Sequence, residues 1–212
     1  MKGKVREGMN ILSSVWLHPK KTVRHMIEHR LLRLAIGLIL VAGFFATFMP
    51  VVDPATYGLE GDDALATEPL SFVGLLVSGL LSSVFALIMM FISVGFIFLF
   101  GKLFKGQGTY WDVFQATALA TIPTIVMGII GFVWAALSIN TFNNGDALSP
   151  MMIAYSIVSL VLGVWSIVIS IATLAEANRY SNWRAFFTLL MPTLIVILLL
   201  VVFLLAVFAM FV

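Results

Sequence analysis

Residues 186–212 read FFTLLMPTLIVILLLVVFLLAVFAMFV, an apolar run without a charged side chain. Crossing a bilayer as a helix takes about 20 consecutive apolar residues, so this stretch predicts a transmembrane helix. The whole chain has the same character, because 61% of its 212 residues are hydrophobic, 10% are charged and the mean hydropathy is +1.10. Soluble domains carry about 25% charged residues. The composition therefore excludes a soluble domain, a nucleic-acid binder and a disordered linker.

Four further apolar stretches are long enough to span a membrane, and turn-forming residues such as those at 53–54, 106–108 and 143–145 separate them. We therefore predict an all-α membrane protein in which a cytoplasmic amphipathic segment at 1–30 precedes a five-helix transmembrane domain at 31–212. The predicted spans cover residues 31–49, 70–100, 115–140, 151–175 and 186–212.

The charges predict the orientation of this bundle. All 12 Lys and Arg residues lie before or just inside the first span, between spans two and three, or between spans four and five. The other two loops carry acids and no base. Cytoplasmic loops are enriched in Lys and Arg, so we expect a cytoplasmic N-terminus and an extracytoplasmic C-terminus. The acidic loop 53–68 could bind a cation, but solvation is the simpler expectation.

Small and hydroxyl residues recur at helical spacing within spans two, three and four. The steps are four residues in span two and alternate between three and four in the other two, so each set lies on one helix face. Membrane helices associate through such residues, which favours close packing over the other interpretation, a polar path. This packing seam comprises Gly74, Ser78, Ser82, Thr117, Thr121, Thr124, Gly128, Gly131, Ser156, Ser159, Gly163, Ser166 and Ser170.

Span five differs from these three spans, because only Ala206 and Ala209 are small from residue 194 onward. Such a helix offers few close-packing sites, so we expect it at the edge of the bundle, facing lipid. Among the charged residues only Arg33 falls within a predicted span. Ionisable groups inside the membrane mark proton relays and ion paths, so the sequence argues against a proton-coupled transporter or pump.

The N-terminal segment is amphipathic over residues 8–30. Val23, Met26 and Ile27 share one helical face, and bases lie on the opposite face. A cationic amphipathic helix joined to a span is typical of a helix in the inner-leaflet interface, where bases meet anionic lipid. The membrane-surface bases would be Lys20, Lys21, Arg24 and Arg30.

One motif suggests chemistry. Residues 25–29 spell H-x-x-E-H, the inverted signature of a zinc protease, although the polar face of a charged helix gives the same letters. Zinc would need a third protein ligand, and the cytoplasmic acids besides Glu28 are Glu7, Asp112 and Glu176. The chain contains no cysteine and no P-loop, G-x-S-x-G or dinucleotide-binding motif. We therefore expect a protein that is not an enzyme and has no cofactor or metal.

Three short motifs carry a family resemblance: WLHPKKT at 16–22, LFKGQGTY at 103–110 followed by ATIP at 120–123, and WRAF at 183–186 ahead of Pro192. With these motifs the chain resembles the Yip family, five-span membrane proteins named for interacting with Ypt/Rab GTPases, and in particular its short prokaryotic branch. Eukaryotic members carry an acidic–Leu–Tyr–Gly–Pro stretch and a Gly-Tyr element that have no counterpart here, which argues against GTPase binding. The resemblance implies a non-catalytic bundle that organises other membrane proteins. Similar bacterial proteins are associated with ABC-type exporters and envelope defence.

The leading expectation is a scaffold or assembly factor of the bacterial inner membrane, accessory to an ABC-type exporter or an envelope-defence system. The alternative is a transporter or channel subunit whose hydroxyl seams line a path for a neutral or lipid-like substrate. Expected partners are the anionic inner leaflet and a membrane protein or second copy, and not nucleic acid. The partner-facing loop residues would be Lys102, Lys105, Tyr110, Trp111, Arg179, Trp183 and Arg184.

Overall fold

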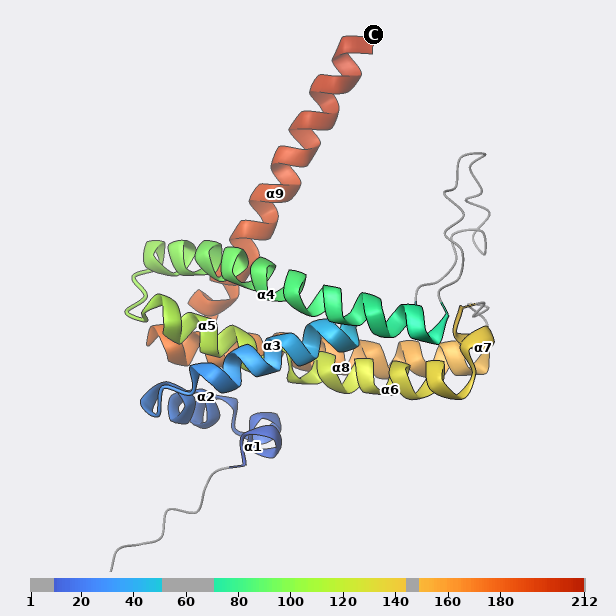
Figure 1. Ribbon diagram of the computed structural model, residues 1–212. Coiled ribbons are helices and arrows are strands. Elements are labelled where there is room, and N and C mark those ends of the chain that lie inside the picture. Colours follow the sequence, from blue (N-terminus) through green and yellow to red (C-terminus); the bar gives the residue numbers. More distant parts are fainter. Residues whose placement is uncertain (1–9, 51–70, 144–148, 212) are drawn as a thin grey trace, which may run out of the picture. The chain divides into compact units, whose positions relative to one another are not determined.

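The computed structural model describes residues 10–50, 71–143 and 149–211, and it is helical throughout these ranges apart from turns (Figure 1). The predicted all-α class is confirmed. The acidic loop 53–68 lies outside the described residues. The helices are α1 (Ile11–Leu17), α2 (Pro19–Glu28), α3 (Leu32–Ala46), α4 (Phe72–Leu103), α5 (Tyr110–Leu119), α6 (Ile122–Leu137), α7 (Ile139–Asn143), α8 (Pro150–Asn178) and α9 (Asn182–Phe211).

Four segments of the described chain are long and apolar enough to cross a membrane: α4, α5 together with α6, α8 and α9. They make the chain a multi-pass membrane protein. The helix of the first predicted span is shorter, because α3 has 15 residues and ends at Ala46 instead of at residue 49. At 1.5 Å per residue it is about 22 Å long, less than the hydrocarbon thickness of about 30 Å. A fifth span therefore stays a prediction.

The third predicted span, 115–140, begins earlier than expected and is interrupted. Thr109 and Asp112 cap α5 reciprocally: the Thr109 N–H donates to Oδ2 of Asp112 at 2.9 Å, and the Asp112 N–H donates to Oγ1 of Thr109 at 3.3 Å. The helix then stops at Leu119 and resumes at residue 122. Pro123 has no N–H to offer the Leu119 carbonyl, which explains the break.

The chain divides into two compact units. The charged unit contains Met1–Leu32, Phe91–Thr117 and Ile169–Val212, and the apolar unit contains Arg33–Met90 and Ala118–Val168. Within the described residues the charged unit holds eight Lys and Arg and three Asp and Glu. In the described part of the apolar unit, Arg33 is the one residue of these four types.

The N-terminal helix α2 begins at Pro19. Proline suits this first position because the N–H that it lacks would have no acceptor within the helix. Its Val23 and Met26 are fully buried, so protein covers the apolar face that the sequence predicts to lie against lipid. The Arg24 guanidinium lies 2.6 Å from Oε1 of Glu176, which joins α2 to α8 within the charged unit. An interfacial position of this segment stays a prediction.

Candidate functional site

In the apolar unit, two glycines of α6 bring the backbone at the C-terminal end of α3 into direct contact. A Cβ atom on Gly128 would collide with the Cβ and carbonyl of Phe45, and one on Gly131 would collide with the carbonyl of Phe48. The obstacles are mostly backbone atoms, which cannot rotate away as the end of a side chain can. These two members of the packing seam thus lie at a close helix contact.

Two further glycines form the contact between α3 and α4, and neither belongs to the predicted packing seam. A Cβ on Gly43 would lie 2.7 Å from the Cβ of Ala86 and 2.9 Å from the Cα of Ser83. A Cβ on Gly79 would lie 3.0 Å from Cδ2 of Phe44. The available signal for this contact was the presence of glycines and small residues in apolar helices. In span one these residues do not recur at regular helical spacing, so the pattern did not mark them.

On α4 the packing seam is displaced by one residue from the buried line. Buried residues at steps of four are Leu75, Gly79 and Ser83. The predicted residues Gly74, Ser78 and Ser82 are half-buried beside that line. A step of four residues turns a helix by slightly more than one full turn, so neighbouring lines run almost parallel and the sequence pattern does not choose between them.

An aromatic cluster fills the core of the apolar unit. The Phe48 and Phe132 ring centroids lie 5.0 Å apart, and Trp134 lies 5.8 Å from Phe142 and 6.0 Å from Tyr155. All of these side chains except Phe132 are at most 9% exposed. These contacts favour close packing in this part of the unit.

Hydroxyl groups of the packing seam bond to backbone carbonyls at the break between α5 and α6. Ser166 Oγ donates from α8 to the Ala120 carbonyl at 3.0 Å, and Thr121 Oγ1 donates to the Ala118 carbonyl at 2.8 Å. Backbone carbonyls at a helix break need such donors inside a membrane. Thr124 is half-buried in the first turn of α6.

The same use of hydroxyls recurs in the charged unit. Thr173 Oγ1 donates from α8 to the Ala116 carbonyl at 3.1 Å and to the Ile169 carbonyl at 2.9 Å. Thr117 Oγ1 donates to the Val113 carbonyl at 2.9 Å, and Ser170 is half-buried. Most of the seam hydroxyls for which a bond is described therefore serve the backbone, which favours packing over a polar path.

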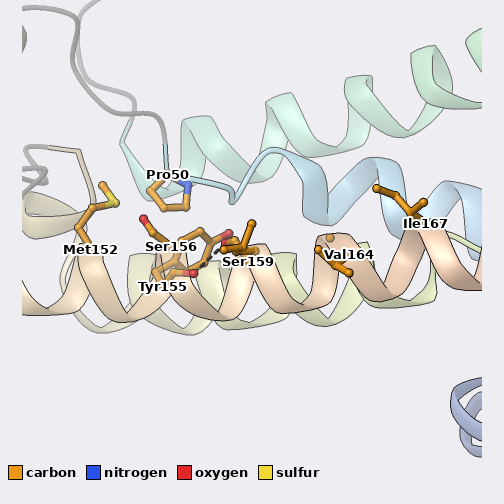
Figure 2. Close-up of a pocket in the computed structure, with 9 residues that line it drawn as sticks. Pro50, Met152, Tyr155, Ser156, Ser159, Val164 and Ile167 are labelled. Atoms are coloured by element: carbon orange, nitrogen blue, oxygen red, sulfur yellow. Dashed lines mark hydrogen bonds between the residues drawn. The ribbon is translucent and has the colours of Figure 1, made fainter. Parts of the chain in front are cut away.

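The remaining members of the packing seam line an open groove along α8 of the apolar unit, with a volume of about 530 Å³ (Figure 2). Ser156 is exposed, and Ser159 Oγ donates to the Tyr155 carbonyl at 2.8 Å. A Cβ added to Gly163 would meet nothing within 4 Å. The groove is lined by Pro50, Met152, Tyr155, Ser156, Ser159, Leu160, Gly163, Val164 and Ile167.

In the charged unit, the loop after α4 closes around the side chain of Asn178, which is 1% exposed. A Cβ on Gly106 would lie 2.5 Å from Asn178 Oδ1, and Cβ atoms on Gly108 and Gly101 would lie 3.2 and 3.3 Å from it. The Gln107 N–H donates to the Asn178 carbonyl at 3.0 Å. We call this contact between the α4–α5 loop and the end of α8 the loop junction.

Two of the expected partner-facing residues also form hydrogen bonds within this unit. Lys102 Nζ donates to the Gly106 carbonyl at 3.2 Å and to the Gly108 carbonyl at 3.0 Å, so its ammonium group holds the loop. Tyr110 Oη donates to the Phe91 carbonyl at 2.8 Å. The other residues of that prediction, Lys105, Trp111, Arg179, Trp183 and Arg184, are exposed.

The H-x-x-E-H motif forms part of α2 and the turn after it. The His25 and His29 ring centroids are 4.1 Å apart, and His29 Nδ1 lies 2.9 Å from the His25 carbonyl. Within the described ranges no three His, Cys, Asp or Glu side chains gather as a metal site would require. Glu7 lies outside those ranges.

Helix α9 exposes most of its apolar surface. In its most apolar part, within Asn182–Leu205, 6% of the residues are buried. Its surface is therefore available to lipid or to another membrane helix.

Comparison with known proteins gave one match. The family model described as the Yip1 domain matches residues 13–204. No curated protein and no solved structure matches the chain.

Proposed function

Since the chain belongs to the Yip1 domain family, we propose that it is a non-catalytic membrane scaffold or assembly factor, accessory to an ABC-type exporter or an envelope-defence system. The observation that carries this proposal is the groove along α8. Its lining is mostly apolar and includes Gly163, over which a neighbouring backbone can pass closely. Without a hydrophobic force between helices in lipid, such close packing is what drives their association. The groove therefore suits one helix of a partner membrane protein.

The chemistry of the apolar unit supports binding over catalysis. Among its described residues only Arg33 carries a fixed charge, and the Ser166 and Thr121 hydroxyls are bonded to backbone carbonyls. A hydrolytic site needs a nucleophile, a base and a group that orients the base within hydrogen-bond reach of one another. The hydrogen bonds described for this unit contain no such set.

We propose a bacterial inner-membrane location, with the N-terminus in the cytoplasm and the C-terminus outside. The concentration of Lys and Arg in the charged unit supports this orientation through the preference of cytoplasmic segments for these residues. Reporter fusions at each terminus, one active only in the cytoplasm and one only outside it, test the proposal. Equal cytoplasmic signals at both termini would contradict five spans.

A second candidate function is a transporter or channel subunit for a neutral or lipid-like substrate. The observation in its favour is that Ser156 and Ser159 lie in the groove, where an acyl chain with a polar end could be bound as well as a helix. Introduced cysteines separate these cases, because the chain has none of its own. A water-filled substrate path predicts that Ser156→Cys and Ser166→Cys both react with a water-soluble thiol reagent. A closely packed bundle that excludes water predicts that Ser166→Cys does not react.

Site-specific photocrosslinking in native membranes tests the scaffold proposal. A photoreactive residue at Val164, in the groove, should crosslink to one membrane protein in stoichiometric yield, whereas the same residue at Ile129 should not. Ile129 of α6 is a matched control because it is 42% exposed and Val164 is 54% exposed. Filling the groove with Gly163→Leu should abolish the Val164 crosslink without lowering stability. Crosslinks only to lipid at both positions would contradict the scaffold and favour the second candidate.

A further inference from the structure

Three helices of the charged unit end with a basic residue in the left-handed backbone conformation that normally favours glycine. The φ angles are 50° at Arg30, 62° at Lys105 and 55° at Arg179, after α2, α4 and α8 respectively. All three side chains are exposed. A side chain with a Cβ is strained in this conformation, and glycine is the usual residue there.

The hydrogen bonds at these three ends have the same pattern. After α4 the Lys105 N–H donates to the Lys102 carbonyl at 2.9 Å, and the Gly106 N–H donates to the Gly101 carbonyl at 2.8 Å. The corresponding bonds recur after α8 and after α2. The conformation is thus imposed by the helix end itself, and a basic residue occupies the glycine position each time.

The attraction of a helix C-terminus for a cation offsets part of this strain. It does not require the charge to be at the one strained position, because Lys or Arg anywhere in the last turn satisfies it equally well. A basic side chain at this position projects from the loop beyond the helix end. This placement suggests a ligand for the charge outside the helix.

Two of the three residues are held by the same contact. Lys105 precedes the loop glycines, and Arg179 follows Asn178, so both flank the loop junction. Through the 3.0 Å bond between Gln107 and Asn178, their Cα atoms are at most about 18 Å apart by chain geometry. Two long flexible side chains can converge over that separation.

Neither charge is neutralised by a described carboxylate. The nearby acids are engaged elsewhere, since Glu176 pairs with Arg24 and Asp112 accepts from the Thr109 N–H. No ion pair to Lys105 or Arg179 occurs within the ranges that the structure describes.

The two residues also share their setting relative to the candidate spans. Each follows the C-terminal end of a helix long enough to cross a membrane, and each precedes a helix whose second residue is an exposed tryptophan, Trp111 or Trp183. Tryptophan is enriched at the headgroup level of the bilayer. The setting therefore favours a lipid headgroup over a soluble acidic protein as the ligand.

We propose that Lys105 and Arg179 together bind the phosphate of an anionic phospholipid in the cytoplasmic leaflet. The charge-assisted hydrogen bonds of Arg and Lys to phosphate oxygens supply the affinity, and the loop junction fixes the position of both residues. This site is independent of the groove along α8, so it stands or falls separately from the scaffold function.

Glycine substitution tests the site without the usual risk of unfolding, because glycine suits the backbone conformation. The full-length protein is reconstituted in lipid nanodiscs that contain phosphatidylcholine and phosphatidylglycerol, and retained lipids are counted by native mass spectrometry. The double variant Lys105→Gly/Arg179→Gly should lose selectivity for phosphatidylglycerol by about fivefold for each residue. Its thermal midpoint should stay the same or rise.

The matched control is Lys20→Gln/Lys21→Gln, which removes two exposed charges from α2 of the same unit. Because these two bases are themselves predicted to lie at the membrane surface, this variant measures the general attraction of surface charge to anionic lipid. It should change lipid selectivity far less than the glycine variant does. Equal losses in the two variants would overturn the proposal, because the preference would then be a general effect of net charge. Unchanged selectivity in the glycine variant would also overturn it, and loss of a co-purifying acidic protein in that case would assign the pair to a protein partner.

Discussion

The apolar unit and the charged unit differ in the residues that dominate their helix contacts. In the apolar unit the decisive residues are glycines such as Gly128 and Gly131, where the absence of a side chain lets backbones touch. In the charged unit the decisive residues are polar groups such as Lys102, Asn178 and Thr173, each of which bonds to or packs against a neighbouring backbone. Close backbone contact tolerates no added atom, whereas a hydrogen-bonded group can lengthen its bond or bond to water instead. Substitutions should therefore be more damaging in the apolar unit.

The largest effect is expected for Gly131→Ala. The added methyl group would occupy the place of the Phe48 carbonyl, so α6 must move away from the end of α3. Overpacking of this kind lowers the free energy of unfolding by about 3 kcal/mol, measurable as a fall in the thermal midpoint in detergent. Gly163→Ala is the control, because its methyl group enters open space. Equal losses in both variants would show that the detergent, and not the contact, sets the result, because helix propensity alone favours alanine over glycine.

A smaller loss is expected for Gly106→Ala at the loop junction. The new Cβ would lie 2.5 Å from Asn178 Oδ1 and 2.8 Å from the Gly101 carbonyl, so the loop must shift and the hold of Lys102 on it weakens. We expect a loss of about 2 kcal/mol in the free energy of unfolding. Gly101→Ala is the comparison, because its Cβ would approach only the Asn178 amide group, at 3.3 Å or more. A larger loss for Gly101→Ala than for Gly106→Ala would contradict this account.

Within the apolar unit, a hydroxyl that bonds between helices should matter more than one that bonds within its own helix. Ser166→Ala removes a bond between helices, whereas Ser159→Ala removes a bond within α8. Interhelical hydrogen bonds in membranes are worth about 0.6 kcal/mol, and the first variant should lose about that amount of unfolding free energy. The second should lose less, because its carbonyl already accepts a bond in the helix. Thermal denaturation of both variants in one detergent measures the difference.

Sequence reasoning predicted which residues form these contacts better than it predicted which helices the contacts join. It placed Gly128, Gly131 and Ser166 on packing faces because helical spacing is visible in one dimension. It could not show that the glycines meet the C-terminal end of α3, since that pairing depends on where a distant helix lies. It also passed over Gly79, because two helical lines one residue apart look alike until a neighbour selects one. Groove residues such as Gly163 follow the same pattern as the packed ones, so periodicity alone does not separate an occupied face from an open one.

The smallest effect is expected where the charged unit relies on an exposed ion pair. Arg24 and Glu176 join α2 to α8, but the Arg24 side chain is 61% exposed, so water and salt screen the attraction. In a double-mutant cycle of Arg24→Gln and Glu176→Gln, we expect a coupling free energy of about 0.5 kcal/mol or less, which falls as salt is added. Amide hydrogen exchange in α2 should be nearly unchanged, because the buried Val23 and Met26 hold this helix in place. A coupling well above 1 kcal/mol that resists salt would instead mean that the pair is desolvated, and the charged unit would then depend on its charges as strongly as the apolar unit depends on its glycines.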